Sequence, residues 1–297
     1  MKVGVIGLGT MGLGAARNLV AKGHEVTGCD LRSEPRAALE AAGGRTVGRP
    51  RELPDDLEAV LTLVVTADQE RSVLLGPEGC APRLPQGAVV ICSATIPPDA
   101  ARALETDLTE AGLLMLDAPV SGGQAGAESG TMTVMASGSD AAFARAEPVL
   151  AAIAGKVFRL GDRAGIGSTV KMVNQLLAGV HIAAAAEAMA LGIRAGADPQ
   201  TLYDVITVSA GNSWMFQNRV PHILAGDDRP LSAASIFIKD LGIVLDQGRA
   251  LNFPLPLASV AHQLFLATAA AGYGGRDDSS VIRFWEALAG IELPKKG

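Results

Sequence analysis

Hydrophobic residues in the first half of the chain come in short runs, and polar or helix-forming segments separate these runs. Such runs occupy residues 2–6, 25–29, 59–65, 88–92 and 113–116. Two further strands are expected at residues 131–137 and 157–160, with a helix at 141–154 between them. Strands that alternate with helices predict a doubly wound, mostly parallel α/β sheet that binds its ligands at the carboxyl ends of the strands.

The second half opens on a long apolar segment at residues 168–194, which contains no proline and only two glycines, Gly179 and Gly192. We expect one helix of roughly 40 Å. Apolar residues cover most of its circumference, which predicts a helix buried between layers. Because strand signals stop near Gly161, we divide the chain into an α/β domain at 1–162 and an all-helical domain at 163–297.

A glycine-rich turn joins the first strand to the first helix. It follows the pattern G-x-G-x-x-G and reads Gly7, Leu8, Gly9, Thr10, Met11 and Gly12. Glycines at this spacing allow a tight turn, and free N–H groups at the helix N-terminus then meet a pyrophosphate. Glycine-rich turns recur in other folds, but the strand-to-helix context favours a Rossmann domain that binds a dinucleotide.

Asp30 ends the second strand, about 20 residues after the glycines. An acid at this position accepts both ribose hydroxyls of NAD and repels the additional phosphate of NADP. The alternative is an ordinary turn aspartate at the end of a strand. Since Arg32 follows two residues later and would weaken the discrimination, we predict NAD and leave NADP open.

Polar residues are rare in the long helix, and three of them lie together near its start. Lys171 shares a face with Asn174 and Gln175, which follow it at three and four positions. A buried lysine is a competent general acid and base, and an amide one turn away can hold a hydroxyl for it. The alternative is a solvated lysine whose stem lies along apolar surface.

Two segments that follow strands carry further candidate ligands. Thr95, in the run Ser93-Ala94-Thr95, is expected at the sheet edge where it would touch the cofactor; ordinary turn chemistry is the alternative. The segment 117–127 contains Ser121, Gly122 and Gly123, which offer a hydroxyl and unobstructed backbone donors to a small carboxylate. A flexible surface loop is the alternative for this segment.

Composition narrows the choice of partner and compartment. The net charge of -6 and the pI near 5.3 argue against nucleic acid and anionic membranes. Three cysteines without C-x-x-C spacing fit a reducing compartment and provide no cysteine metal site, so we expect no metal. With strand-like sequence beginning at Lys2, we expect a soluble cytoplasmic protein without a leader peptide.

These motifs together resemble the β-hydroxyacid dehydrogenases, the group that includes 3-hydroxyisobutyrate dehydrogenase and tartronate semialdehyde reductase. The resemblance covers nearly the whole chain and rests on four motifs in order. They are the glycine turn at 7–12, Asp-Ala-Pro-Val-Ser-Gly-Gly from Asp117, Gly165-Ile-Gly167 leading to Lys171 and Asn174, and Lys239-Asp240-Leu241. One departure is Thr66-Ala67, where relatives commonly have Leu-Pro.

The resemblance implies an NAD-dependent dehydrogenase of a small hydroxy acid, with Lys171 as catalytic acid and base and Asn174 as the catalytic amide that orients the substrate. It further implies that Ser121, Gly122 and Gly123 bind the substrate carboxylate. Thr95 and Lys239 would contact the cofactor near the nicotinamide, with Asp240 supporting Lys239. A homodimer or homotetramer is expected, and a cofactor-binding module without turnover is the alternative from another functional class.

The last part of the chain carries three looser expectations. Trp214, Phe216 and Phe237 would either wall the active site or belong to the core. Residues 272–278 look like a mobile loop, which a final helix from Ser279 would follow. In the family that the chain resembles, the C-terminal region closes over the site.

Overall fold

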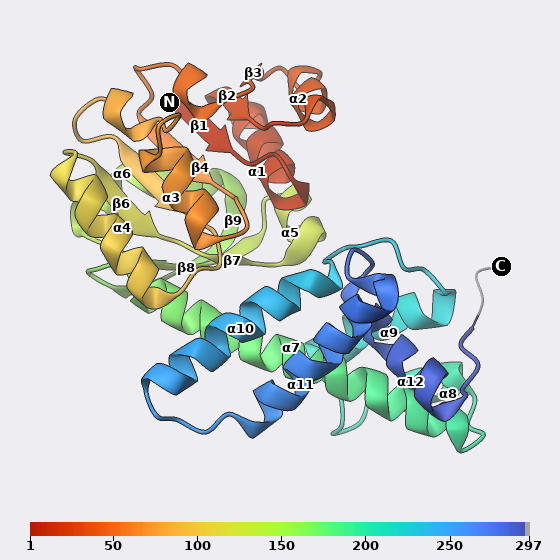
Figure 1. Cartoon of the computed structure of the whole chain (residues 1–297). Coiled ribbons are helices and arrows are strands. Elements are labelled where there is room, and N and C mark those ends of the chain that lie inside the picture. The colour runs from red at the N-terminus through yellow and green to blue at the C-terminus, as the bar shows by residue number, and fades with distance from the viewer. Residues whose placement is uncertain (295–297) are drawn as a thin grey trace. The chain divides into compact units, whose positions relative to one another are not determined.

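The computed structural model describes residues 1–294, which form two compact units that meet in sequence between Lys171 and Met172. The first unit is built on a sheet and the second is helical (Figure 1). Helix α7 (Ile166–Arg194) begins in the first unit and continues into the second. The predicted fold class is thereby confirmed: a Rossmann sheet, a long helix and a helical C-terminal part.

Within residues 1–294 the sheet has nine strands in the order β3-β2-β1-β4-β5-β6-β8-β7, with β9 beside β8. Strands β1 to β6 pair in parallel, whereas β8 runs antiparallel to β6 and β7. The strands are β1 (Lys2–Ile6), β2 (Glu25–Cys29), β3 (Arg45–Val47), β4 (Ala59–Thr62), β5 (Val89–Cys92), β6 (Leu114–Asp117), β7 (Val120–Ser121), β8 (Met132–Ser137) and β9 (Ala154–Gly161).

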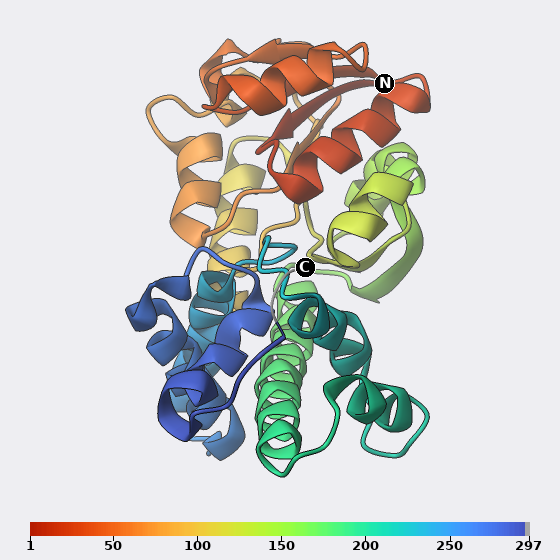
Figure 2. The same ribbon diagram turned by 90° about the vertical axis from the view of Figure 1, so that its right-hand side faces the viewer.

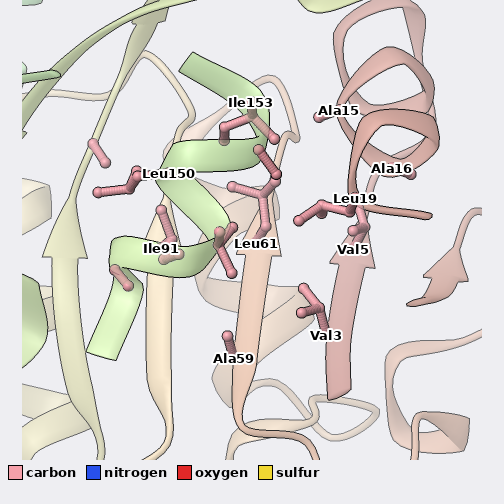
Figure 3. Close-up of a cluster of buried hydrophobic side chains, with 14 of the residues drawn as sticks. Val3, Val5, Ala15, Ala16, Leu19, Ala59, Leu61, Ile91, Leu150 and Ile153 are labelled. Atoms are coloured by element: carbon pink, nitrogen blue, oxygen red, sulfur yellow. The ribbon is translucent and has the colours of Figure 1, made fainter. Parts of the chain in front are cut away.

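Helices cover both faces of this sheet (Figure 2). On one face, Leu19 and Leu150 pack with Val5, Leu61 and Ile91 of the strands (Figure 3). The helices that contribute to this face include α1 (Thr10–Ala21), α2 (Ser33–Glu40), α5 (Gly123–Ser129) and α6 (Asp140–Ile153). The other face is covered by α3 (Ala67–Leu75) and α4 (Pro98–Glu110), with the short 3-10 turns η1 (Pro50–Glu52) and η2 (Ala81–Arg83) in the connections.

The segment 117–127 is more ordered than the flexible loop that was one reading of its sequence. Val120 and Ser121 pair with β8, and α5 begins at Gly123. A two-residue strand and a seven-residue helix are too short to give a period in the sequence, so neither was predicted.

The second unit packs its helices around one core. Its helices are α8 (Pro199–Thr207), α9 (Trp214–Ala225), α10 (Ala234–Ala250), α11 (Pro256–Thr268), the π-turn η3 (Ala269–Tyr273), the 3-10 turn η4 (Asp278–Ile282) and α12 (Arg283–Ala289). Phe216 and Phe237 belong to this core, whereas Trp214 is largely exposed. The core reading is therefore correct for the two phenylalanines.

The composition of helix α7 predicted burial on all sides, but in the structure the helix is only partly buried. Ile182 and Met189 lie in the core of the second unit, but Val173 and Leu177 are 51% and 49% exposed. In residues 1–294, α7 alone has the length and hydropathy of a membrane span, and core helices of soluble proteins have these properties as well. Since part of α7 contributes to the core, we assign it as a core helix.

The end of the segment 272–278 is firmly held, which corrects the expectation of a mobile loop. Asp277 and Asp278 are fully buried. Arg219 of α9 donates to Asp278 through Nε at 2.5 Å and Nη2 at 3.0 Å. Asp277 accepts bonds from the Leu231 and Ser279 backbone N–H groups. Polar loop residues thus became buried because partners distant in sequence satisfy them.

Candidate active site

The glycine turn between β1 and α1 can be built only from glycines at two of its positions. A Cβ on Gly7, whose φ is +89°, would lie 2.7 Å from the Leu63 carbonyl oxygen, and one on Gly12 would overlap the Gly7 carbonyl. At Gly9 the nearest atom to a Cβ would be Arg32 Nη2 at 4.0 Å. The turn is therefore tightly closed on the protein side and open at Gly9, which suits a pyrophosphate at the N-terminus of α1.

Asp30 lies directly beside this turn. Its Oδ2 accepts the Leu8 N–H at 2.9 Å, and its Oδ1 accepts the Arg32 N–H at 2.9 Å. The Arg32 guanidinium completes the pair through Nε and Nη2, each at 3.2 Å. Partial burial raises the pKa of Asp30, but the bonds from Arg32 and Leu8 outweigh it and hold that pKa below its ordinary value. The carboxylate is thus ionised and fixed next to the glycines.

The segment after β5 has a buried hydroxyl that the protein does not satisfy. The Ser93 N–H donates to the Thr62 carbonyl, which places the segment at the carboxyl edge of the sheet. Among residues 1–294, the Ser93 Oγ is buried without a hydrogen-bond partner. Thr95, the residue predicted to contact the cofactor, follows in the same segment and is half-buried. An unsatisfied hydroxyl at this edge fits a bound ligand.

Thr66, at the departure from the family pattern, caps helix α3. Its hydroxyl accepts the Gln69 N–H at 3.1 Å, and Gln69 Oε1 accepts the Thr66 N–H at 3.3 Å. This reciprocal pair is a capping box. Thr66-Ala67 therefore starts the helix through this capping box.

Ser121, Gly122 and Gly123 connect β7 to α5. Gly122 and Gly123 have φ values of +132° and +61°. A residue with a side chain would be strained at these backbone angles. Helix α5 docks on α1, since Asn18 Nδ2 donates to the Ala127 carbonyl at 2.7 Å. The Ser-Gly-Gly segment is thus held by the same helix that starts at the glycine turn.

Asp117, the first residue of this motif, fixes the start of α7. Its Oδ2 accepts the Gly165 N–H at 2.8 Å and the Ser168 N–H at 2.9 Å, and its Oδ1 accepts the Ser168 hydroxyl at 2.7 Å. Burial raises the pKa of Asp117, and the bonds from Ser168, Gly165 and Ser137 only partly oppose this. A Cβ on Gly167 would lie 2.7 Å from the Asp117 carbonyl oxygen, so this close approach requires glycine.

Lys171 follows Ser168 by one helical turn and is only 6% exposed. It is therefore buried, as a proton-transfer role requires, and the solvated reading of this lysine is wrong. The position of the side chain depends on the anchored start of α7. Its role as acid and base stays a prediction.

In the second unit, a hydrogen-bonded chain joins two further predicted residues, Asn174 and Lys239. Asn174 Nδ2 donates to Gln175 Oε1 at 3.0 Å, and Gln175 Nε2 donates to Asp240 Oδ2 at 2.5 Å. Lys239 Nζ lies 2.8 Å from Asp240 Oδ1. The expected support of Lys239 by Asp240 is thus present.

Three residues of these networks were not among the predicted site residues: Asp117, Ser168 and Gln175. Asp117 opens a motif that was interpreted only through its serine and glycines, and Ser168 is a typical N-terminal helix residue. Gln175 was noted only for its helical face. Within residues 1–294, no group of three His, Cys, Asp or Glu side chains is placed to hold a metal.

Comparison with known proteins finds one family model for each half of the chain. Residues 2–161 match the family model of the NAD binding domain of 6-phosphogluconate dehydrogenase. Residues 165–285 match the model described as NAD-binding of NADP-dependent 3-hydroxyisobutyrate dehydrogenase. Each half of the chain is therefore assigned independently.

Similar proteins cover the chain over its full length. An L-threonate dehydrogenase of Cupriavidus necator is 60% identical over 99% of this chain and 98% of its own. The L-threonate dehydrogenase of Escherichia coli K12 is 52% identical over 98% and 96%. A crystal structure of 3-hydroxyisobutyrate dehydrogenase from Salmonella typhimurium is 51% identical with a TM-score of 0.92, covering 96% of this chain and 99% of that one. This chain belongs to the 3-hydroxyisobutyrate dehydrogenase-like family of NAD(P)-dependent β-hydroxyacid dehydrogenases.

Proposed function

We propose that the protein oxidises L-threonate to 2-dehydro-L-erythronate with NAD. The observation that carries this proposal is the 60% identity, over nearly the full length of both chains, to an L-threonate dehydrogenase. Residues 156–196, 209–216 and 253–258 also look most like that enzyme within the family. The buried Lys171 and the glycine turn supply the two elements that any such reaction needs.

In the proposed mechanism Lys171 is the base. Its neutral amine takes the proton of the substrate hydroxyl, and in the reverse direction its ammonium protonates the alkoxide. When bound, a dinucleotide would supply the hydride acceptor for the same carbinol carbon. The alcohol thus loses one proton and one hydride and becomes a ketone.

The remaining residues bind and orient. Asn174 holds the reacting hydroxyl, and Ser121 with the Gly122 and Gly123 backbone binds the substrate carboxylate. Thr95 and Lys239 would help to hold the dinucleotide. The open space at Gly9 and the unsatisfied Ser93 hydroxyl support a bound dinucleotide in the first unit.

NAD is the proposed cofactor because Asp30 is ionised beside the glycine turn, where it accepts ribose hydroxyls. Arg32 has 63% of its side chain exposed and is paired with Asp30, so a 2′-phosphate would compete for the same guanidinium. We expect Asp30→Ala to raise the ratio of kcat/KM with NADP to kcat/KM with NAD at least tenfold. A change of this size corresponds to the loss of about one charge-assisted hydrogen bond. An unchanged ratio would contradict the selector role of Asp30.

A second substrate, 3-hydroxyisobutyrate, is favoured by a specific observation. The Salmonella typhimurium structure with a TM-score of 0.92 is described as a 3-hydroxyisobutyrate dehydrogenase. D-glycerate and tartronate semialdehyde are further candidates within the family. A binding module without turnover is the remaining alternative, and the retention of Lys171, Asn174 and Ser121 argues against it.

Initial rates of NAD reduction test the proposal. Purified protein is assayed with L-threonate, D-glycerate and 3-hydroxyisobutyrate, and each assay is repeated with NADP. The expected result is the highest kcat/KM for L-threonate with NAD. Preference for another acid would overturn the substrate, and inactivity with all acids would favour the binding module.

We also propose that residues 1–162 bind the cofactor and that 163–297 provide substrate binding and oligomerisation. The expected assembly is a homodimer or homotetramer in the cytoplasm, with no nucleic-acid or membrane partner. Light scattering coupled to size exclusion measures the assembly directly. A monomeric mass would contradict the role given to the second domain.

A further inference from the structure

Glu70 of α3 is a fully buried acid whose two oxygens are unequally satisfied. The Thr62 hydroxyl donates to its Oε1. In the described part of the chain, its Oε2 is buried without a hydrogen-bond partner. An ionised carboxylate with one bare oxygen is costly to bury, whereas the protonated acid is much less so. The site is therefore suited to the neutral form of Glu70.

Glu70 lies against a row of polar side chains at the carboxyl ends of three neighbouring strands. Thr62, Cys92 and Asp117 are the last residues of β4, β5 and β6, and all three are buried. The register pairs Thr62 with Cys92 and Cys92 with Asp117. Neighbouring strands lie about 4.8 Å apart, so the row is about 10 Å long. It connects the Glu70 site to Asp117.

The charge of Glu70 depends on pH because opposing effects act on its pKa. Burial and the charge of Asp117 raise this pKa, whereas hydrogen bonds from Thr62 and Cys92 lower it, and the balance is about 7. The titratable groups that face Glu70 are Asp117 and the thiols of Cys92 and Cys80. Burial raises the pKa of both thiols, to about 12 for Cys80, so both stay neutral. Glu70 is thus the group of the row that changes charge near neutral pH.

Asp117 joins the row to the first turn of α7. Its carboxylate accepts the Gly165 and Ser168 N–H groups and the Ser168 hydroxyl, which close it off from water. When Glu70 ionises, two like charges lie in a buried row where solvent screens their repulsion poorly. Hydration of Asp117 relieves this repulsion. Water reaches Asp117 only when the first turn of α7 moves away from the carboxylate.

We propose that the row from Glu70 to Asp117 is a pH-sensitive clamp on the start of α7. With Glu70 protonated, Asp117 carries the single charge of the row and holds the first turn. With Glu70 ionised, this turn opens, and Lys171, which follows Ser168 by one turn, is no longer held in place. The inference goes beyond the proposed function, because it concerns the anchoring of α7 and needs no substrate.

Amide hydrogen exchange at several pH values tests the clamp. Peptides from residues 163–170 report on the start of α7 and peptides from residues 66–75 on α3, after correction for the intrinsic pH dependence of exchange. In the wild-type protein we expect protection of 163–170 to fall about tenfold between pH 6 and pH 8.5, as one unit of coupled pKa implies. Residues 66–75 should keep their protection. An equal fall in both peptides, or constant protection of 163–170, would overturn the clamp.

Three variants assign the effect to the charge of Glu70. Glu70→Gln stays neutral, so protection of 163–170 should change less than about twofold over the same pH range. Thr62→Val removes a bond that lowers the pKa of Glu70, so the transition should move about one pH unit upward. The matched control is Glu40→Gln. Glu40 also accepts a threonine hydroxyl, from Thr46, but it is exposed, and this variant should behave as the wild type does.

The direction of the shift in Thr62→Val separates charge from packing, because a packing defect lowers protection at every pH. If Thr62→Val does not fold, Thr62→Ala is used for the same comparison. A transition that persists in Glu70→Gln, or that does not move in the Thr62 variant, would overturn the inference. None of these measurements requires turnover. A protein that oxidises no hydroxy acid but shows the expected exchange would refute the proposed function and support the clamp.

Discussion

Asp117 in the first unit and Asp240 in the second are both buried carboxylates that contact residues of α7, but they have different partners. Asp117 is held by backbone N–H groups and hydroxyls. Asp240 is held by one amide and the ammonium of Lys239. Removing one of several neutral donors lowers the free energy of unfolding only modestly. Removing the cation that pairs with a buried carboxylate lowers it more, because the negative charge is left uncompensated.

The same contrast recurs at two carboxylates outside the proposed site. Glu70 of the first unit is fully buried; burial raises its pKa to about 7, against bonds from Thr62 and Cys92 that lower it. Asp278 of the second unit is fully buried and paired with Arg219; burial still raises its pKa to about 6. Glu70 is thus held by neutral donors, and Asp278 by a cation.

The largest expected effect is the loss of turnover when Lys171 is replaced. Lys171 lies on α7 between two residues that bond the compared carboxylates. These are Ser168, which bonds Asp117, and Gln175, which bonds Asp240. If Lys171 is the general base, Lys171→Ala should lower kcat by about 10²- to 10⁴-fold. Dinucleotide affinity should stay near that of the wild type. Steady-state rates and NADH titration measure the two quantities. A variant with wild-type rates would show that another group is the base.

Breaking the cation pairing of the second unit should have the next largest effect. Arg219→Met leaves Asp278 buried without its guanidinium, and we expect about 3 to 5 kcal/mol lower free energy of unfolding. Denaturant unfolding measures this change. Adding Asp278→Asn should restore part of the loss, since the stranded charge is removed. No recovery in the double variant would mean that packing of Arg219, and not its charge, supplies the stability.

The division into a sheet and helices could be predicted because long segments repeat their pattern. Buried strands such as 2–6 and 25–29 and the helix that starts at Pro199 have local signals, a run of apolar residues or a capping aspartate. The glycine turn was predictable for the same reason, since close approach at Gly7 and Gly12 admits no other residue.

The anchoring networks were not predictable because they join residues distant in sequence. Ser168 bonds Asp117 across 51 positions, and Gln175 bonds Asp240 across 65. Arg219 and Asp278, 59 positions apart, are paired in the structure, and this pair holds the buried end of the predicted mobile loop. The hydrophobic periodicity of a sequence does not show which distant residues form hydrogen bonds after folding. Exposed apolar residues of α7, among them Val173 and Leu177, were misjudged in the same way, because composition does not show which face is covered.

Removing the charge of Glu70 tests how the first unit tolerates an acid without a cation. The folded-state pKa of about 7 lies above the ordinary 4.5, so the wild-type fold loses stability as pH rises from about 4.5 to about 7. Glu70→Gln should abolish this loss and be more stable than wild type by up to about 3 kcal/mol at pH 8. Denaturant unfolding at pH 5 and pH 8 measures the difference. Glu34→Gln, at an exposed position, should show no such pH dependence.

The difference between the Glu70→Gln and wild-type proteins should be small at pH 5 and should reach its full value above pH 7. A difference that is the same at both pH values would mean that the amide fits better for steric reasons. The neighbouring Asp117, whose charge also raises the pKa of Glu70, would then not contribute through electrostatics.

The smallest expected effect comes from one neutral donor to Asp117. Ser168→Ala removes the 2.7 Å hydroxyl bond to Oδ1 but keeps the two backbone N–H groups on Oδ2. We expect about 1.5 kcal/mol lower free energy of unfolding. The control is Thr169→Val on the same turn, because the Thr169 hydroxyl bonds the Gly165 carbonyl and not a carboxylate. If Asp117 positions Lys171 through this turn, Ser168→Ala should also lower kcat severalfold while Thr169→Val does not. Equal effects of both variants on kcat would mean that any hydroxyl of the first turn serves, and that the carboxylate has no particular part in placing the amine.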